Sequence, residues 1–318
     1  MLYIYDMCFM RCTFVLIVWI VIMVMLLSDV SIEGFMPVAK SFKSPQKLAI
    51  ACLTRGYEHI KGYDTLIKRN RSLDTLVTII KDLYEVVDVV IFHEGNIPLS
   101  HQQHIQNATQ NMPIKFVDVQ TTGTRAFSAD NHRNMKANDI IFPTECSDQF
   151  SIGYKHMCHF WFIDFIECMH SYTHCIRIDE DCTMIKFPID VIQRMDASGV
   201  VFVTPYYNAA DASCVVNGME ETSLEFMKAY NIIEQNKVES INNNPYTNMC
   251  IVNMAYFRSH EMYKLYAEHI HKSMGIYINR WGDLPLWGYV LANLVPKEKY
   301  TLDTGISYFH GSHNAAIN

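Results

Sequence analysis

The segment Thr173-His-Cys-Ile-Arg-Ile-Asp-Glu-Asp181 decides how the fold of this chain is interpreted. Residues 173–178 predict a buried strand, and three carboxylates follow directly where that strand would leave its sheet. Asp179 and Asp181 stand at i and i+2, so on an extended chain they would point the same way. Such a pair can ligate a divalent cation, directly or through water. A solvated acidic turn is the alternative interpretation.

Strand-like and helical patterns alternate on both sides of this segment. Residues 47–53 form an apolar run bounded by Pro45 and Gly56, residues 74–84 place apolar side chains at helical spacing, and residues 86–92 are again strand-like. Further strands are expected at 115–119 and 199–204, and an apolar helix at 156–170. This order predicts an α/β fold with a mostly parallel mixed sheet and helices on both faces. Ligands of such sheets bind beyond the carboxyl ends of the strands, where the acidic triplet lies.

Composition and charge exclude several classes of protein. Of the 318 residues, 50% are hydrophobic and 19% are charged, which rules out a disordered, collagen-like or coiled-coil chain. The chain has 26 basic and 33 acidic residues, a net charge of −7, and no block of like charges. We therefore expect no nucleic acid among its partners.

An uncharged apolar run at residues 13–27 (TFVLIVWIVIMVMLL) predicts a transmembrane helix before the globular part. As a helix it would span roughly 22 Å of a hydrocarbon layer of ~30 Å. We interpret it as an uncleaved signal anchor; a cleaved signal peptide is the alternative, although no small-x-small site follows it. Arg11 precedes the run while Asp29 and Glu33 follow it, so residues 1–12 would lie in the cytoplasm. Residues 28–46 would form a short stem and residues 47–318 a lumenal domain.

A lumenal domain would meet an oxidising solvent, so we expect some disulfides among its cysteines, although the sequence does not give their connectivity. No two cysteines have C-x-x-C spacing, which argues against a structural zinc site. Two glycosylation sequons, at Asn70 and Asn107, fit lumenal exposure.

The acidic triplet matches two kinds of enzyme loop. Asp179-Glu-Asp-Cys-Thr183 fits the D-x-D-x-T loop of aspartate-nucleophile phosphohydrolases, which resemble the haloacid dehalogenases and in which Asp179 would attack phosphorus. That loop usually lies near the start of its domain, after an uninterrupted apolar strand. Here it lies in mid-chain and the strand contains Arg177. We therefore favour the D-x-D logic of nucleotide-sugar transferases, in which a bound cation neutralises a diphosphate and assists its departure.

Longer strings around the triplet resemble one family. The strings are Gly153-Tyr-Lys-His-Met-Cys-His-Phe160, similar to Tyr-Arg-His-Met-Cys-Arg-Phe; Arg177-Ile-Asp-Glu-Asp181, similar to Arg-Val-Glu-Pro-Asp; residues 248–259; Asn279-Arg-Trp-Gly-Asp-Leu-Pro285, similar to Glu-Arg-Trp-Gly-Asp-Ala-Pro; and Asp303-Thr-Gly305 with His310. In these motifs the chain resembles the fungal α-1,2-mannosyltransferases of the killer-toxin-resistance type, glycosyltransferase family 15.

The resemblance implies a single-pass type II membrane protein of the Golgi or ER lumen, with a GT-A-like fold. It further implies a retaining glycosyltransferase that moves mannose from GDP-mannose, or a sugar from another nucleotide sugar, to a hydroxyl of a glycan or glycoprotein acceptor. The linkage would be α-1,2 and the cofactor Mn²⁺. A non-catalytic sugar-binding or assembly protein on the same fold is the alternative.

The resemblance also assigns roles to single residues. It makes Asp179, Asp181 and His310 metal ligands, with His313 as the alternative to His310, and it makes Asp181, Arg280 and Trp281 substrate-binding. It places Tyr154, Cys250 and Asp283 at the reacting centre. Trp281 could equally be a buried structural tryptophan. Arg55 is expected to bind substrate for another reason, because it lies in the loop after the first strand, where such sheets hold a nucleotide.

Three residues depart from the family's pattern. Glu180 replaces a proline between the two acids, which adds a charge and still permits metal binding, and Trp287 replaces a histidine often found there, which would alter acceptor recognition. Cys250 replaces a glutamate proposed as nucleophile or stabiliser near the anomeric carbon. If a covalent intermediate requires that carboxylate, this chain lacks its nucleophile. A front-face route, in which the leaving phosphate helps to deprotonate the acceptor hydroxyl, needs none.

Overall fold

A computed structural model describes residues 44–109, 112–126, 150–208, 212–232, 244–312 and 315–317, which all belong to one compact unit, Lys43–Asn318. The cytoplasmic tail and anchor predicted at 1–12 and 13–27 lie outside these residues, as does the predicted stem up to residue 43. Residues 44–46, assigned to the stem from sequence, belong to the first strand. In the part that the structure describes, no helix has both the length and the apolar character needed to cross a bilayer.

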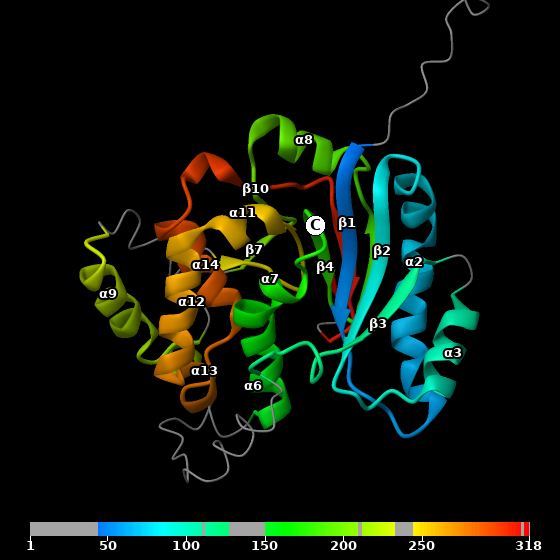
Figure 1. Ribbon diagram of the computed structural model, residues 1–318, viewed down its shortest axis with the longest axis horizontal. Coiled ribbons are helices and arrows are strands. Elements are labelled where there is room, and N and C mark those ends of the chain that lie inside the picture. The colour runs from blue at the N-terminus through cyan, green and yellow to red at the C-terminus, as the bar shows by residue number, and fades with distance from the viewer. Residues whose placement is uncertain are drawn as a thin grey trace, which may run out of the picture. The chain divides into compact units, whose positions relative to one another are not determined.

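A seven-stranded mixed sheet organises the described residues, with the strand order β10-β6-β9-β4-β1-β2-β3 (Figure 1). Its strands are β1 (Ser44–Leu53), β2 (Tyr84–His93), β3 (Ile114–Asp118), β4 (His174–Ile178), β6 (Phe202–Thr204), β9 (Met249–Asn253) and β10 (Tyr300–Leu302). β1 runs parallel to β2 and β4, β2 to β3, and β6 to β10, whereas β9 runs antiparallel to β4 and β6. The mostly parallel mixed sheet expected from the sequence is confirmed.

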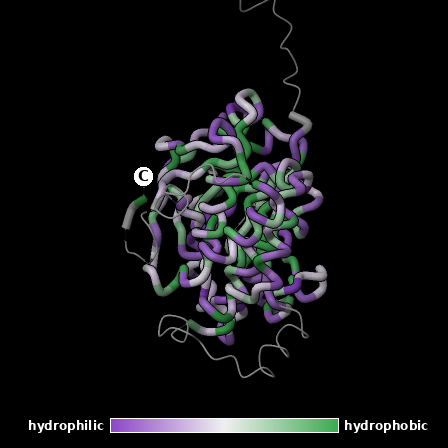
Figure 2. Tube along the Cα trace, turned by 90° about the vertical axis from the view of Figure 1, so that its left-hand side faces the viewer, coloured by the Kyte–Doolittle hydropathy of each residue, from purple (hydrophilic) through white to green (hydrophobic). Residues whose placement is uncertain are grey.

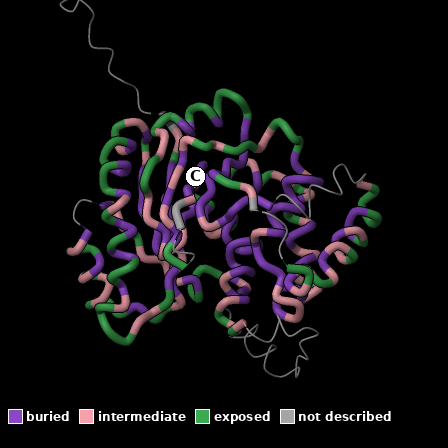
Figure 3. Tube along the Cα trace, turned by 180° about the vertical axis from the view of Figure 1, so that it is seen from behind, coloured by how far each residue is buried: buried purple, intermediate pink, exposed green. Residues whose placement is uncertain are grey.

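Helices cover both faces of the sheet. Successive residues of β1 point to opposite sides, so each face packs against its own set of helices. Leu48 and Ile50 pack in one cluster with side chains of α2 (Asp64–Ile80) and α8 (Val191–Ser198). Ala49 and Ala51 join the other cluster, which includes side chains of α12 (Glu261–Ser273) and α14 (Asp283–Asn293). Figure 1 shows α2 and α3 (Leu99–Ala108) on one side of β1 and β2, with α6 (Ile152–His159) and α12 on the other. Hydrophobic stretches lie inside the fold in Figure 2, and the buried stretches in Figure 3 include strands of the central sheet.

Two smaller sheets and several short helices complete the described fold. β5 (Cys182–Lys186), β11 (Ser307–His310) and β12 (Ala315–Ile317) form an antiparallel sheet, and β7 (Tyr207–Asn208) pairs with β8 (Asn244–Pro245). The short helices are η2 (Ile60–Tyr63), η4 (Ser213–Val215), α9 (Met219–Ala229), α11 (Met254–Ser259), α13 (Gly275–Ile278) and η5 (Lys297–Lys299). The pairing of β5 with β11 places His310 opposite Cys182, so the end of the chain lies beside the acidic triplet.

The predicted helices exist, but their bounds differ. The helix expected at 74–84 is α2, which begins at Asp64 and ends at Ile80, because Tyr84 already starts β2. The helix expected at 156–170 consists of α6, a π-helical turn η3 (Phe160–Asp164) and α7 (Phe165–Cys168).

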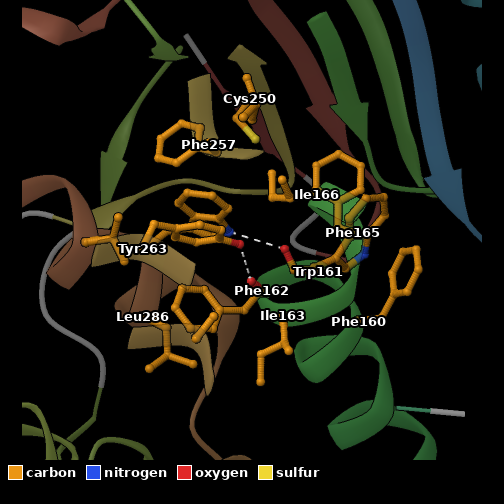
Figure 4. Packing of buried hydrophobic residues seen from close by; sticks show 14 of the residues in the cluster. Phe160, Trp161, Phe162, Ile163, Phe165, Ile166, Cys250, Phe257, Tyr263 and Leu286 are labelled. Carbon is orange, nitrogen blue, oxygen red and sulfur yellow. Dashed lines mark hydrogen bonds between the residues drawn. The ribbon is translucent and has the colours of Figure 1, made fainter. Parts of the chain in front are cut away.

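The π-helical turn lies in the aromatic cluster of Figure 4. There Tyr263 Oη donates to the Phe162 carbonyl at 2.6 Å and Trp287 Nε1 to the Trp161 carbonyl at 3.3 Å. Trp287 is only 2% exposed and stacks on the Tyr263 ring, so at this position the chain has a core residue.

One sequon prediction was wrong. Asn70 has no exposed surface within α2, so an oligosaccharide cannot be attached there in the folded chain. Asn107, near the end of α3, is exposed. Cys214 is disulfide-bonded, whereas the described cysteines with free thiols are Cys52, Cys158, Cys168, Cys175, Cys182 and Cys250.

The loop between α13 and α14 is fixed by one tight contact. Trp281 is 1% exposed, its Nε1 donates to the Asn217 carbonyl at 2.7 Å, and its ring packs against Gly275. A Cβ on Gly275 would lie 2.1 Å from that ring. Arg280 and Asp283 flank this tryptophan, so its packing sets their positions.

We therefore expect Gly275→Ala to lower the free energy of unfolding by about 1–3 kcal/mol, because the buried ring has to shift to admit the methyl group. Gly153→Ala is the matched control, since a Cβ there would meet only Ser151 Oγ at 3.9 Å. Chemical denaturation of both variants measures the difference. Equal stability of the two would show that the ring can move without cost.

Candidate functional site

A cavity of about 380 Å³ opens where β4 ends. Because β9 runs antiparallel to β4 and Met249 pairs with Ile178, the residues just before β9 lie beside the residues just after β4. The loop before α14 and the end of β11 complete the wall. The lining residues are Tyr154, Met157, Arg177, Asp179, Asp181, Tyr246, Thr247, Asn248, Arg280, Gly282, Asp283, Leu284, His310 and Ser312. The cavity thus lies at the carboxyl end of the β4 strand, where ligands of such sheets bind.

The acidic triplet forms a turn. Cys182 N donates to the Asp179 carbonyl at 3.1 Å, so residues 179–182 do not continue β4. The extended-chain argument for Asp179 and Asp181 was therefore wrong, although both side chains line the cavity.

Asp181 and His310 face each other across this turn. Nε2 of His310 lies 3.6 Å from Oδ2 of Asp181, and its Nδ1 lies 3.1 Å from Tyr246 Oη. Backbone and side chain of Ser312 both donate to Asp181 Oδ2, the backbone nitrogen at 2.9 Å. Asp181, His310 and Cys182 together offer ligand atoms within 4.8 Å of one another.

The chemistry of this group fits a hard divalent cation. Carboxylate oxygens suit Mn²⁺ and imidazole suits transition metals, whereas thiolates favour softer ions. Cys182 is fully buried, and burial raises the pKa of its thiol, which disfavours the thiolate form that binds metals. Asp181 and His310 therefore offer the atoms that could hold such a cation; His313, the alternative to His310, lies outside the described residues.

Asp179 is held on the same wall by two neighbours. Its Oδ2 accepts from Asn248 Nδ2 at 2.9 Å and its Oδ1 from Arg177 Nε at 3.3 Å. Burial raises the pKa of Asp179 to about 6, against the opposing effect of Arg177. A cation beside it would favour the ionised carboxylate.

Arg177 connects the two acidic sides of the cavity. Its side chain is 3% exposed, its guanidinium bonds both Asp179 and Asp283, and it lies 4.2 Å from the centre of the Trp161 ring. Asp283, the first residue of α14, is 8% exposed. The ion pair between Arg177 and Asp283 is therefore desolvated. Loss of either residue would leave the charge of the other buried and uncompensated.

Arg280 and Tyr154 also line the cavity. Arg280 Nη2 donates to Tyr154 Oη at 2.8 Å, and the guanidinium stacks 4.1 Å from the Phe150 ring centre. Arg280 has φ of 62°, a left-handed conformation that is costly for a residue with a Cβ. Burial raises the pKa of Tyr154, so its hydroxyl stays protonated and can donate a hydrogen bond.

Three residues assigned from the sequence lie outside the cavity lining. Trp281 packs on Gly275, which matches its structural alternative. Cys250 is 2% exposed within the aromatic cluster, beside Phe257 in Figure 4, and burial raises the pKa of its thiol to about 12. Arg55 is exposed after β1, with its guanidinium 5.0 Å from the Tyr57 ring centre.

Other cavity residues received no role from the sequence. Asn248 contacts Asp179 and lies 3.4 Å from His310 Nε2, and Ser312 bonds Asp181. Asn248 is the first residue of one of the sequence strings that resemble the family, and this position could have marked it as a site residue. Nothing in the sequence points to Ser312, because its contact joins positions 131 residues apart.

Comparison with known proteins places the chain among mannosyltransferases. Residues 59–316 match the family described as glycolipid 2-alpha-mannosyltransferase. Glycolipid 2-alpha-mannosyltransferase 1 of Candida albicans is 25% identical over 173 residues, which cover 50% of this chain and 40% of that protein. The chain therefore matches less than half of that relative's length.

Two solved structures share the fold. Mannosyltransferase Ktr4p of Saccharomyces cerevisiae has a TM-score of 0.67 at 15% identity, over 85% of this chain and 73% of that chain. Core-mannan synthase A of Aspergillus fumigatus, in its Mn/GDP form, has a TM-score of 0.66 at 16% identity, over 86% and 76%. The expected likeness to the GT-A mannosyltransferase fold is confirmed.

We expect His310→Ala to weaken Mn²⁺ binding by about tenfold or more, because the imidazole ligand is lost. Cys182→Ser should change it by less than about threefold, since the protonated thiol contributes little. Manganese titration followed by electron paramagnetic resonance measures both affinities. An equal loss in the two variants would instead make the thiol a ligand.

Proposed function

This chain belongs to the glycolipid 2-alpha-mannosyltransferase family, and we propose from this that it is a metal-dependent mannosyltransferase. It would transfer mannose from GDP-mannose to a hydroxyl of a glycan or glycoprotein, with retention and in α-1,2 linkage. One observation carries the proposal: a single cavity gathers an acid–histidine pair, a second acidic group paired with arginine, and a separate arginine. These are the groups that a metal-bound diphosphate and a sugar would require.

Asp181, His310 and Asp179 would hold the cation; the choice of Mn²⁺ is supported by the Aspergillus fumigatus structure of the same fold, which is a Mn/GDP form. The cation would offset the negative charge of the departing diphosphate. Asn248 and Ser312 orient the two carboxylates of this set, because Asn248 donates to Asp179 and Ser312 donates to Asp181. A preorganised ligand set lowers the reorganisation needed on binding.

Arg280 and Asp283 would bind the substrates from the other side. The Arg280 guanidinium has no carboxylate partner among the described ion pairs, so it is free to meet an anionic phosphate. Asp283 is bonded to Arg177 through one carboxylate oxygen and would accept hydrogen bonds from sugar hydroxyls. Because Arg177 already occupies its Oδ2, Asp283 would position the sugar and leave proton removal to another group.

The leaving phosphate is the better candidate for the base that removes the proton of the acceptor hydroxyl. The Cys250 thiol is protonated, buried and outside the cavity lining, so it would serve neither as nucleophile nor as base. A front-face route in which the diphosphate oxygen accepts the acceptor proton requires no carboxylate at position 250. This route retains the anomeric configuration.

The apolar run at 13–27 supports the further proposal that the protein is anchored as a single-pass type II membrane protein. Residues 1–12 would be cytoplasmic, 28–43 a stem, and 44–318 a catalytic domain facing the Golgi or ER lumen.

Asp181→Asn should abolish Mn²⁺-dependent mannose transfer and GDP release, because the substitution removes the anionic ligand of the cation. Asp196→Asn, on α8 outside the cavity lining, is the control and should keep normal activity. GDP release from GDP-mannose, with circular dichroism to verify folding, measures the effect. Near-normal activity of Asp181→Asn would refute the metal assignment.

The same assay separates the alternative functions. A wild-type chain that binds GDP-mannose but releases no GDP would be a binding protein. If the chain instead cleaves a phosphate monoester and vanadate inhibits this cleavage, the chain would be an aspartate-nucleophile phosphohydrolase.

Cys250→Ala should keep kcat within about threefold of wild type, since no bond to the substrate is lost. Cys175→Ala, which truncates another buried cysteine of the same cluster, shows the effect of packing alone. A loss of several orders of magnitude in Cys250→Ala only would make the thiol catalytic.

A further inference from the structure

We propose that Glu180 is a positioning residue for the nucleotide, which acts through Tyr57 on Arg55. The inference rests on the proposed function, since it concerns how the donor is held, and it assigns a role to the carboxylate that distinguishes this chain's triplet. The loop of residues 54–57, named here the β1 loop, follows β1 at the edge where the nucleotide is expected.

Glu180 points away from the cation group and into the β1 loop. It is absent from the cavity lining and from the group of ligand atoms formed by Asp181, Cys182 and His310. Its Oε1 accepts from Tyr57 Oη at 2.6 Å, and its Oε2 accepts from Thr54 Oγ1. Both carboxylate oxygens are thus used to tie the turn after β4 to the loop after β1, across 123 positions of sequence.

Tyr57 transmits this attachment to Arg55. Its backbone nitrogen donates to Tyr63 Oη at 3.0 Å, and its ring packs on Gly62, where a Cβ would lie 2.4 Å away. These contacts fix the ring from the η2 side and the Glu180 bond fixes its hydroxyl. The exposed Arg55 guanidinium then lies 5.0 Å from the ring centre, where a cation is attracted to the π face.

A carboxyl group offers two acceptor oxygens, and Glu180 uses both of them for these bonds. A proline between the two acids would stiffen the turn through its own ring. In this chain two hydrogen bonds to the side chain can serve that purpose and fix the neighbouring loop as well. Arg55 would be held in place before the nucleotide arrives, which reduces the entropy lost on binding.

Four full-length variants test the inference. Glu180→Ala and Tyr57→Phe should each raise the Kd for GDP, at saturating Mn²⁺, by about tenfold, because each removes the hydrogen bond between Glu180 and the Tyr57 hydroxyl. The double variant should bind no more weakly than Glu180→Ala, because Glu180→Ala already removes the bond that Tyr57→Phe breaks. Glu180→Gln, which keeps an acceptor oxygen, should recover most of the affinity. Isothermal calorimetry measures each Kd.

Kinetics distinguish positioning from general damage. The KM for GDP-mannose should rise with the Kd for GDP, while kcat and the Mn²⁺ half-saturation stay within about threefold of wild type. Glu268→Ala, which removes a glutamate bonded to Arg125 and Lys272 on α12, is the matched control and should leave the Kd for GDP unchanged.

Each outcome decides between the inference and its premise. Three results would overturn the role of Glu180 and leave the proposed function intact. They are an unchanged GDP affinity in Tyr57→Phe, additive losses of affinity in the double variant, and a change in the Mn²⁺ half-saturation without a change in the Kd for GDP. A wild-type chain that binds no GDP with Mn²⁺ would overturn the proposed function, and the inference with it.

Discussion

The site depends on one buried cation, the guanidinium of Arg177. It stands in the middle of the sheet, 3% exposed, bonded to Asp179 at the end of its own strand and to Asp283 at the start of α14, with Trp161 against its face. A buried charge is tolerated only when it is paired and hydrogen-bonded. This requirement joins β4, η3 and α14 at a single point, and the cavity opens directly beside it.

The aromatic cluster behind Arg177 gives that point its rigidity. Trp161 and Phe162 lie on a π-helical turn whose carbonyls accept from Trp287 and Tyr263, so the turn's irregular backbone is satisfied without water. Cys250 belongs to this packed layer. A small apolar thiol there is compatible with the core beside Arg177, and it leaves the chemistry to groups that face the cavity.

The functional side chains are distributed over elements far apart in sequence. The turn after β4 supplies the acids, the segment before β9 supplies Asn248, the loop before α14 supplies Arg280 and the end of β11 supplies His310. Trp281, packed on Gly275, holds Arg280 in its left-handed conformation. The cost of that strained conformation is offset by packing outside the cavity, as is common where a side chain must be aimed.

By itself the sequence determined the strand-helix order, the position of the acidic triplet and the family, because hydrophobic periodicity and short motifs are local. It misplaced the start of α2, treated residues 179–181 as extended, and admitted Asn70 as an exposed sequon. Burial and turn geometry depend on neighbours from elsewhere in the chain. Only the tertiary structure decided that Trp281 and Cys250 are core residues, that Ser312 bonds Asp181, and that Glu180 faces the β1 loop. Each of these is a contact between distant segments, which no local pattern encodes.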